Sequence, residues 1–135
     1  MSHMTTIETE FRDEECLLKA LKDLGVEDVQ KHSTPHQLEG YMGDLREQKA
    51  HLVVSREQVN KHLSGGSSND FGFLLKDGKY QAVVSEYDKS RWWNAKHGLL
   101  TQRYNYHKVF KEAKRQHKTI SETKLKDGTI KLSIA

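Results

Sequence analysis

The chain has 135 residues, a length at which proteins normally build one hydrophobic core, so we expect a single domain. Hydrophobic residues make up 35% of the composition and charged residues 30%, which indicates a small core and a strongly polar surface. No stretch approaches the roughly 18 consecutive apolar residues of a membrane-spanning helix, which excludes that class. The single cysteine, Cys16, excludes an intramolecular disulfide and a cysteine-rich zinc module, and it fits a cytoplasmic, reducing location.

Positive charge is concentrated in one segment. The formal net charge of the whole chain is only +3. Residues 91–118 hold eight Lys or Arg and one acidic residue, whereas residues 1–90 hold 11 basic and 16 acidic residues. This asymmetry bears on what the surface attracts and not on the fold.

The start of the chain predicts a strand followed by a helix. Residues 5–11 alternate apolar and polar side chains, the period of a half-buried strand. Asp13 is a suitable N-cap for a helix over 13–24, in which apolar residues repeat at helical spacing. Gly25 can adopt the left-handed conformation that ends such a helix.

Polar residues dominate the next segment. Residues 26–37 contain the only proline, Pro35, and predict a weak strand and a loop. Short strands are expected at 39–42 and 51–56. Residues 58–70 are rich in Gly, Ser and Asn, which lose much entropy on ordering and bury little surface, so we expect a mobile surface loop there.

Two β-hairpins are predicted from the same pattern. Residues 71–85 and 120–134 each consist of two strand-like runs that flank an Asp-Gly pair. Asp77-Gly78 and Asp127-Gly128 supply the positive φ angles that tight hairpin turns need.

The segment between the hairpins predicts an amphipathic helix near 99–118 with a basic outer stripe. Its apolar side contains Tyr106, Phe110, Ala113 and His117. The opposite face carries Lys108, Lys111, Arg115 and Lys118. Gly98 is expected to separate this helix from a shorter helical piece with Trp92 and Trp93. One of these tryptophans should point outward, because we expect that neighbours cannot both face a core.

Several blocks of the sequence resemble one known family in the same order. They are the MSH opening, LKALKDLG at 18–25, GYMG at 40–43, DFGF at 70–73 leading into GKYQAVV, TQRYNYHKV at 101–109 and DGTIKLSI at 127–134. The chain is similar to the hypothetical chloroplast reading frame thirty-five family of plastids and cyanobacteria, a domain of unknown function with bacterial relatives. QRYNYH, residues 102–107, is the most specific block, whereas residues 58–70 and the Trp92–Trp93 region depart from the family. The resemblance implies no defined chemistry; it implies a partner-dependent role, with a partner of ferredoxin or ATPase type.

The QRYNYH block supplies the candidate site. Arg103 and His107 stand four residues apart on one helix face with Tyr106 beside them, so we expect a buried polar network or a shallow pocket. The proposed binding face consists of Gln102, Arg103, Tyr104, Tyr106, His107, Trp92 and Trp93.

Other chemistries have weaker signals. His3 and His107 with Glu8 or Glu10 were considered as metal ligands, but the sequence lacks the spacing of known zinc motifs, so neither a metal nor a cofactor is expected. Cys16 falls on an apolar helix face, where a buried thiol is the ordinary outcome. GYMG and SGGSS lack the context of a phosphate-binding loop. Nothing marks a catalytic carboxylate pair among the 19 acidic residues, which favours a protein that is not an enzyme without excluding one.

Two classes of function remain. The first is a non-enzymatic adaptor subunit that binds a protein partner in a larger assembly. The alternative is a nucleic-acid-binding domain that contacts phosphates through the basic helix face, with Lys108, Lys111, Lys114, Arg115 and Lys118. We prefer the adaptor, because a basic helix face is more often solvated surface than a binding footprint.

The predicted fold is a single α+β domain over residues 1–135. A mainly antiparallel sheet of about six to eight short strands, with the two hairpins among them, follows from the turn signals. Two amphipathic helices, at 13–24 and near 99–117, should cover one face of this sheet.

Overall fold

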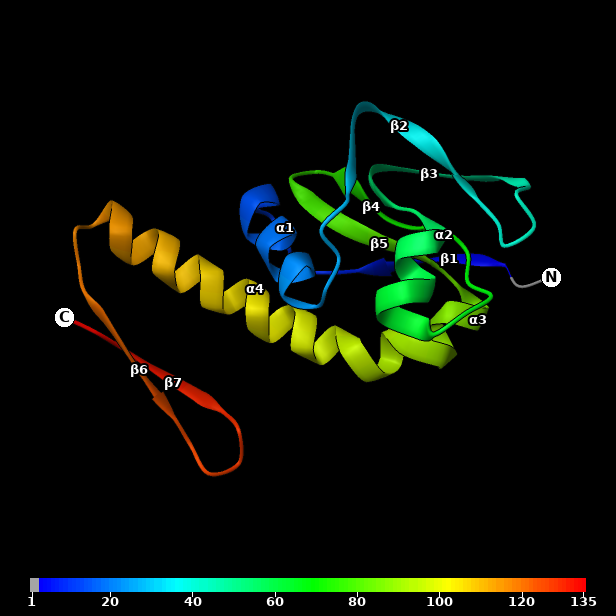
Figure 1. The fold of residues 1–135 in the computed structure, drawn as a ribbon. Coiled ribbons are helices and arrows are strands. Elements are labelled where there is room, and N and C mark those ends of the chain that lie inside the picture. Colours follow the sequence, from blue (N-terminus) through cyan, green and yellow to red (C-terminus); the bar gives the residue numbers. More distant parts are fainter. Residues whose placement is uncertain (1–2) are drawn as a thin grey trace.

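An antiparallel five-stranded sheet forms the centre of the fold, with its strands in the order β1-β5-β4-β3-β2 (Figure 1). The computed structural model describes residues 3–135, so the first two residues of the MSH block lie outside the described range. The strands are β1 (Met4–Glu8), β2 (Gln30–Glu39), β3 (Leu45–Val54), β4 (Phe71–Lys76) and β5 (Lys79–Ser85). Every neighbouring pair runs antiparallel, and helices pack on the sheet. The predicted single α+β domain is therefore confirmed.

The first predicted helix is confirmed as α1 (Glu14–Asp23). Its N-cap is Asp13, whose carboxylate accepts a hydrogen bond from the backbone N of Cys16 at 3.0 Å. The helix ends at Gly25, which has a φ of +100°. Both ends therefore lie where the local sequence places them.

Helix α4 (Asn94–Arg115) packs on the same side of the sheet as α1 (Figure 1). The short helix α3 (Glu86–Asp88) and a π-helical turn, Lys89–Trp93, lead directly into it. Gly98 lies inside α4, so the expectation that it separates two helices is wrong. One interior glycine costs a helix only about 1 kcal/mol, less than the packing of a 22-residue helix supplies.

The main core lies between the sheet and these two helices. It contains Leu17, Ala20 and Leu21 of α1, Leu100 and Tyr104 of α4, and Phe71, Phe73, Tyr80, Ala82 and Val84 of the sheet. The expectation that two amphipathic helices cover one face of the sheet is confirmed.

Strand β2 and the first part of strand β3 cover the other face of the sheet. Strand β3 pairs with β4 only through residues 52–54, and its earlier part bends away with β2. Ala50 and Leu38 thereby lie over Gly72. A second cluster of buried residues forms on this side, with Met4, Leu38, Ala50, Val53 and Val83.

The polar segment before β3 is more regular than its sequence predicts. Strand β2 runs through Pro35, where only a weak strand and a loop are expected. Because β2 is an edge strand, a residue without an N–H donor is tolerated there. The strand expected at 39–42 is wrong, because GYMG at 40–43 forms the turn between β2 and β3.

The expectation of a surface loop over 58–70 is wrong. Helix α2 (Arg56–Val59) continues into a π-helical turn, Asn60–Ser64. Val59 and Leu63 are buried in the main core, so this segment contains two apolar anchors that its Gly and Ser content obscures.

Asn69 and Asp70 form a buried polar cluster at the end of this segment. The two carboxylate oxygens of Asp70 accept hydrogen bonds from the backbone N atoms of Glu39 and Arg56, both at 2.8 Å. The side-chain oxygen of Asn69 accepts from Tyr41 N at 2.9 Å. The cluster joins the β2–β3 turn to the start of β4. These hydrogen bonds order the polar residues of the segment.

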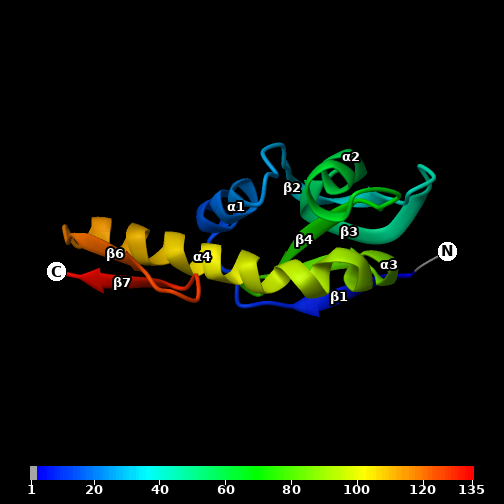
Figure 2. The same cartoon turned by 60° about the horizontal axis from the view of Figure 1, so that its bottom comes forward.

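Both predicted hairpins are present, but the second stands apart from the sheet. Asp77 and Gly78 have φ angles of +53° and +81°, as a type I′ turn between β4 and β5 requires. Strands β6 (Ile120–Lys124) and β7 (Ile130–Ile134) form their own two-stranded sheet beside the outer half of α4 (Figure 2). The expected single sheet of six to eight strands is therefore corrected to five strands plus a separate hairpin.

Gly72 provides a test of the close packing on the covered face. A Cβ at this position would lie 2.5 Å from Ala50 Cβ and 2.7 Å from the Leu52 carbonyl oxygen. We expect Gly72→Ala to lower the free energy of unfolding by about 1–3 kcal/mol, as measured by urea denaturation. Gly98→Ala is the matched control, because a Cβ at this position would have no atom within 4 Å outside the backbone of its own helix and alanine is the better helix former. It should raise that free energy by about 0.5–1 kcal/mol. Equal effects of the two substitutions would contradict the close approach.

Candidate functional site

Both tryptophans are buried, so the expectation that one of them points outward is wrong. Trp92 and Trp93 are 3% and 4% exposed, and their rings lie 4.9 and 5.7 Å from that of Phe71. Neighbouring helical residues point about 100° apart. Both can be buried here because the π-helical turn Lys89–Trp93 contacts β5 on one side and the turn Asn60–Ser64 on another.

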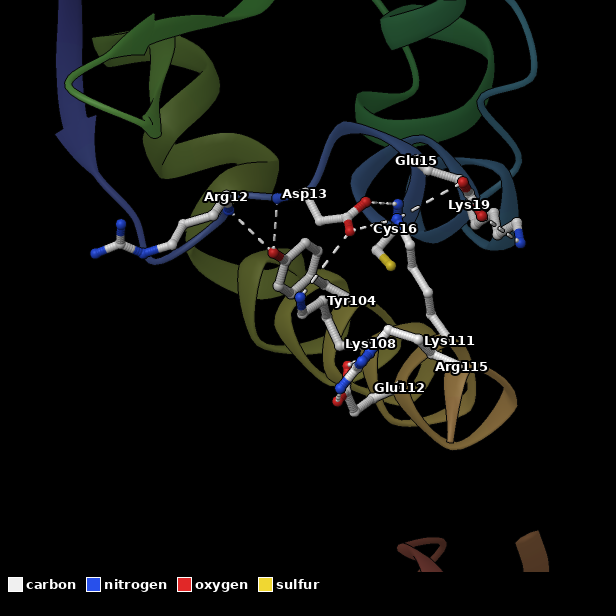
Figure 3. Close-up of polar contacts among 10 residues, drawn as sticks. All are labelled: Arg12, Asp13, Glu15, Cys16, Lys19, Tyr104, Lys108, Lys111, Glu112 and Arg115. Carbon is white, nitrogen blue, oxygen red and sulfur yellow. Dashed lines mark hydrogen bonds and ion pairs between the residues drawn. The ribbon is translucent and has the colours of Figure 1, made fainter. Parts of the chain in front are cut away.

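Tyr104 of the QRYNYH block fastens α4 to the start of α1 (Figure 3). Its hydroxyl accepts hydrogen bonds from the backbone N atoms of Arg12 and Asp13, at 2.9 and 3.0 Å. The ring is buried and lies 4.8 Å from that of Phe11. This predicted site residue therefore has a structural role.

Arg103 and His107 join at the other end of α1. Arg103 Nε donates to Asp23 Oδ2 at 2.8 Å, and His107 Nε2 lies 2.6 Å from the same oxygen. Burial acts to raise the pKa of Asp23, but these two hydrogen bonds outweigh it and hold the pKa below its usual value. The predicted polar network exists, although it is only partly buried and depends on Asp23, a residue that the sequence did not bring to notice.

The basic stripe of α4 is largely paired with carboxylates. Lys111 Nζ lies 2.7 Å from Asp13 Oδ2 and 3.7 Å from Glu15 Oε2, as Figure 3 shows. Lys108 Nζ lies 3.9 Å from the same Asp13 oxygen. Burial acts to raise the pKa of Asp13, and the hydrogen bonds from Lys111 and from Cys16 N lower it overall. Lys108 and Lys111 of the stripe therefore border α1, although both side chains stay about half exposed.

The C-terminal end of the stripe has two parts. Arg115 pairs with Glu112 within the helix. Lys114 and Lys118 are exposed and have no carboxylate partner among residues 3–135. Lys118 lies beyond the last residue of α4.

The outer side of the QRYNYH block faces the C-terminal hairpin. The guanidinium carbon of Arg103 lies 4.0 Å from the centre of the Tyr106 ring. A hydrogen bond with Glu122 of β6, aided by burial, raises the pKa of Tyr106. A shallow pocket of about 220 Å³ lies between helix and hairpin, lined by Gln102, Arg103, Asn105, Tyr106, Val109, Ile130 and Leu132. Arg103 lines this pocket and His107 does not, so it is not a pocket shared by the predicted pair.

A larger groove of about 560 Å³ lies between β1 and the first half of α4. One wall is the continuous stretch of residues 7–11, and the other wall comes from the start of α4. The residues of the second wall and its ends are Lys89, Trp93, Asn94, His97, Thr101, Tyr104 and Asn105. The His97 ring stacks on that of Trp93, with centroids 5.8 Å apart.

Sequence reasoning did not find this groove, because one wall comes from residues 7–11 and the other from residues 89–105, which are far apart along the chain. The alternating residues of the first strand are a local signal for a strand and carry no information on what lies beside it. Of the residues that line the groove, the sequence patterns point only to Tyr104, Trp93 and the strand over residues 5–11.

The other chemistries have no support in the described part of the chain. Within residues 3–135, no group of three or more His, Cys, Asp or Glu side chains is placed to hold a metal ion. Cys16 is buried, and this burial raises the pKa of its thiol, which disfavours the reactive thiolate. No helix of this part of the chain is long and apolar enough to span a bilayer.

Comparison with known proteins places the chain in a family. The family described as "Protein of unknown function (DUF1257)" matches residues 20–133. The chain belongs to this family. A relative in Pyropia yezoensis, "Uncharacterized protein ycf35", is 28% identical over 140 residues, with 99% of this chain and 96% of the relative covered. No solved structure matches the chain significantly. The resemblance stated from the sequence blocks is thus confirmed, and the DUF1257 match includes the QRYNYH block.

In this DUF1257 chain, the cluster of Asp23, Arg103 and His107 should make the free energy of unfolding depend on pH. The lowered pKa of Asp23 means that the carboxylate stabilises the fold above its unfolded pKa of about 4, and that this stabilisation is lost as pH falls through the folded pKa. We expect Asp23→Asn to cost about 1 kcal/mol of unfolding free energy at pH 7, since the group is partly exposed. Urea denaturation from pH 7 to pH 3 should show this difference shrink below pH 4.

Asp28→Asn is the control for that series, because Asp28 is an exposed residue of the connection between α1 and β2. It should change the unfolding free energy little at any pH. A difference between wild type and Asp23→Asn that stays constant down to pH 3 would contradict the role of the Asp23 charge.

Proposed function

We propose that this protein is a non-enzymatic interaction subunit that binds a partner protein in the groove between β1 and α4. The observation that carries the proposal is the groove itself, whose lining includes the half-buried Ile7 and the buried rings of Phe11, Trp93 and Tyr104. Covering apolar surface is favourable by about 25 cal/mol per Å². Aromatic side chains with a polar rim are the composition typical of protein interfaces.

The arrangement of polar groups supports binding over catalysis. The Tyr104 hydroxyl is already engaged by two backbone amides, and the His97 ring is stacked on Trp93. The charged residues of the groove, Glu8, Glu10 and Lys89, line it along with amide and hydroxyl side chains. Such groups suit positioning and specificity at an interface. Location in the cytoplasm and a ferredoxin- or ATPase-type partner remain predictions from the sequence.

Nucleic-acid binding is the second candidate, and one observation favours it: Lys114 and Lys118 are exposed basic residues at the end of the helix. The contacts of Lys108 and Lys111 weigh against it. A phosphate at either lysine would compete with Asp13, which these residues already approach. We therefore rank this function below protein binding.

Site-specific crosslinking in the native host tests the proposal. A photoreactive phenylalanine analogue at Asn105, which is exposed and lines the groove, should crosslink one protein partner. Adding Thr101→Arg should reduce that product at least tenfold, because the new side chain fills the groove. Mass spectrometry of the crosslinked band identifies the partner.

Ala95 supplies the matched controls, because it is an exposed residue of α4 that does not line the groove. The analogue at position 95 should not give the same band, and Ala95→Arg should leave the Asn105 product unchanged. Equal products from both positions, or loss of the product in both arginine variants, would contradict docking in the groove.

Oligonucleotide binding separates the two candidate functions. Under the proposal, the wild-type protein shows no micromolar binding to a 20-nucleotide RNA or DNA at 150 mM salt in a fluorescence anisotropy titration. Micromolar, salt-sensitive binding that Lys114→Glu with Lys118→Glu abolishes would favour the nucleic-acid function instead.

A further inference from the structure

Strand β1 has one open edge. It is the terminal strand of the sheet and pairs only with β5, through Met4↔Ser85 to Glu8↔Gln81. Thr6 and Glu8 are exposed. An edge strand of this kind presents unpaired backbone N–H and C=O groups to any chain that comes beside it.

The hydrogen-bond pattern shows which residues face outward. The carbonyl oxygen of His3 accepts a hydrogen bond from Glu86 N at 2.7 Å, which makes the next pair, Met4 and Ser85, a non-hydrogen-bonded pair. Since the two kinds of pair alternate, Thr5 and Ile7 bond to β5. The N–H and C=O groups of Thr6 and Glu8 therefore point to the open edge.

The groove begins at the end of this edge, where Ile7 and Glu8 of β1 are among its lining residues. Its first wall is the end of β1 and the residues after it, and both views place β1 alongside the first half of α4 (Figures 1 and 2). A strand added to β1 would direct alternate side chains toward α4, over the part of the groove that the buried rings of Phe11 and Trp93 line. The other side chains would lie next to Thr6 and Glu8.

The charged side chains that line the groove indicate which kind of peptide segment can bind there. Two carboxylates, Glu8 and Glu10, lie on the β1 wall, and the basic side chains that line the groove are Lys89 and His97. An incoming segment with basic residues near Glu8 and apolar residues facing α4 complements both the charge and the apolar surface.

We infer that the partner enters this groove as an extended peptide segment, with apolar and basic residues in alternation, and pairs with Thr6 and Glu8 as an added strand of the sheet. Main-chain hydrogen bonds then supply affinity, and the alternate side chains supply specificity. This inference rests on the proposed function and specifies the form of the partner.

Amide hydrogen exchange on the full chain tests the inference. The probe is a panel of end-blocked heptapeptides in which Lys alternates with Val, Ile, Leu, Phe or Tyr. We expect at least one peptide to bind with a Kd below 1 mM and to slow exchange of the Thr6 and Glu8 amides at least tenfold. The amides of Thr5 and Ile7 should change little, because they already bond to β5. Thr101→Arg should abolish binding and Ala95→Arg should not.

Backbone methylation of the bound peptide gives a second measurement. N-methylation at every second residue should weaken binding at least tenfold in one register and not in the other. Binding that shifts Thr101 and Asn105 but leaves the Thr6 and Glu8 amides unprotected would overturn strand addition. If no peptide binds while crosslinking at Asn105 succeeds, the inference fails and the proposed function stands. Protection of Thr6 and Glu8 that rises with protein concentration alone would show a second copy as the occupant and overturn the inference.

Discussion

The contact between α1 and α4 is the interaction on which the rest of the surface depends. It is fixed at both ends of α1: Tyr104 accepts hydrogen bonds from the residues that begin α1, and Arg103 and His107 meet Asp23 where the helix ends. Two separated attachments fix both the position and the direction of a helix, which a single contact does not. One half of α4 is thereby held beside β1, where it forms a wall of the groove. The other half extends past α1 and supports the C-terminal hairpin (Figure 2).

The same contact explains why the QRYNYH block has two roles. On a helix, residues three or four apart share a face, so Arg103 and His107 point together toward α1 while Gln102 and Asn105 lie on other sides. Arg103 and His107 bind Asp23, and Arg103 also lines the hairpin pocket with Gln102 and Asn105; Asn105 lines the groove as well. Part of the basic charge of α4 also serves this contact through Lys111. A segment rich in basic residues can therefore form ion pairs within the protein itself.

The polar cluster of Asn69 and Asp70 plays a comparable part where the end of β2, the start of α2 and the start of β4 meet. Burial raises the pKa of Asp70, although its carboxylate accepts hydrogen bonds from two backbone N–H groups. The loss of contact with water therefore outweighs these two hydrogen bonds. Burying polar groups is costly unless they are hydrogen-bonded, and here the donors come from β2 and from the start of α2. The cluster orders a segment whose composition alone predicts a loop, and it holds the β2–β3 turn with exposed Tyr41 and Met42 in place.

Local chemistry by itself determined the elements whose signals lie within a few residues: the Asp13 cap and Gly25 end of α1, the Asp77-Gly78 turn and the amphipathic part of α4. The sequence also contained the blocks that mark the family. The spacing of four residues between Arg103 and His107 placed both side chains on one face of the helix. Tertiary structure alone decided what lies against each element, because packing partners are separated by tens of residues and composition does not encode their contact. This is why both tryptophans are buried, why Lys111 meets Asp13, and why the groove has one wall from residues 7–11 and the other from residues 89–105.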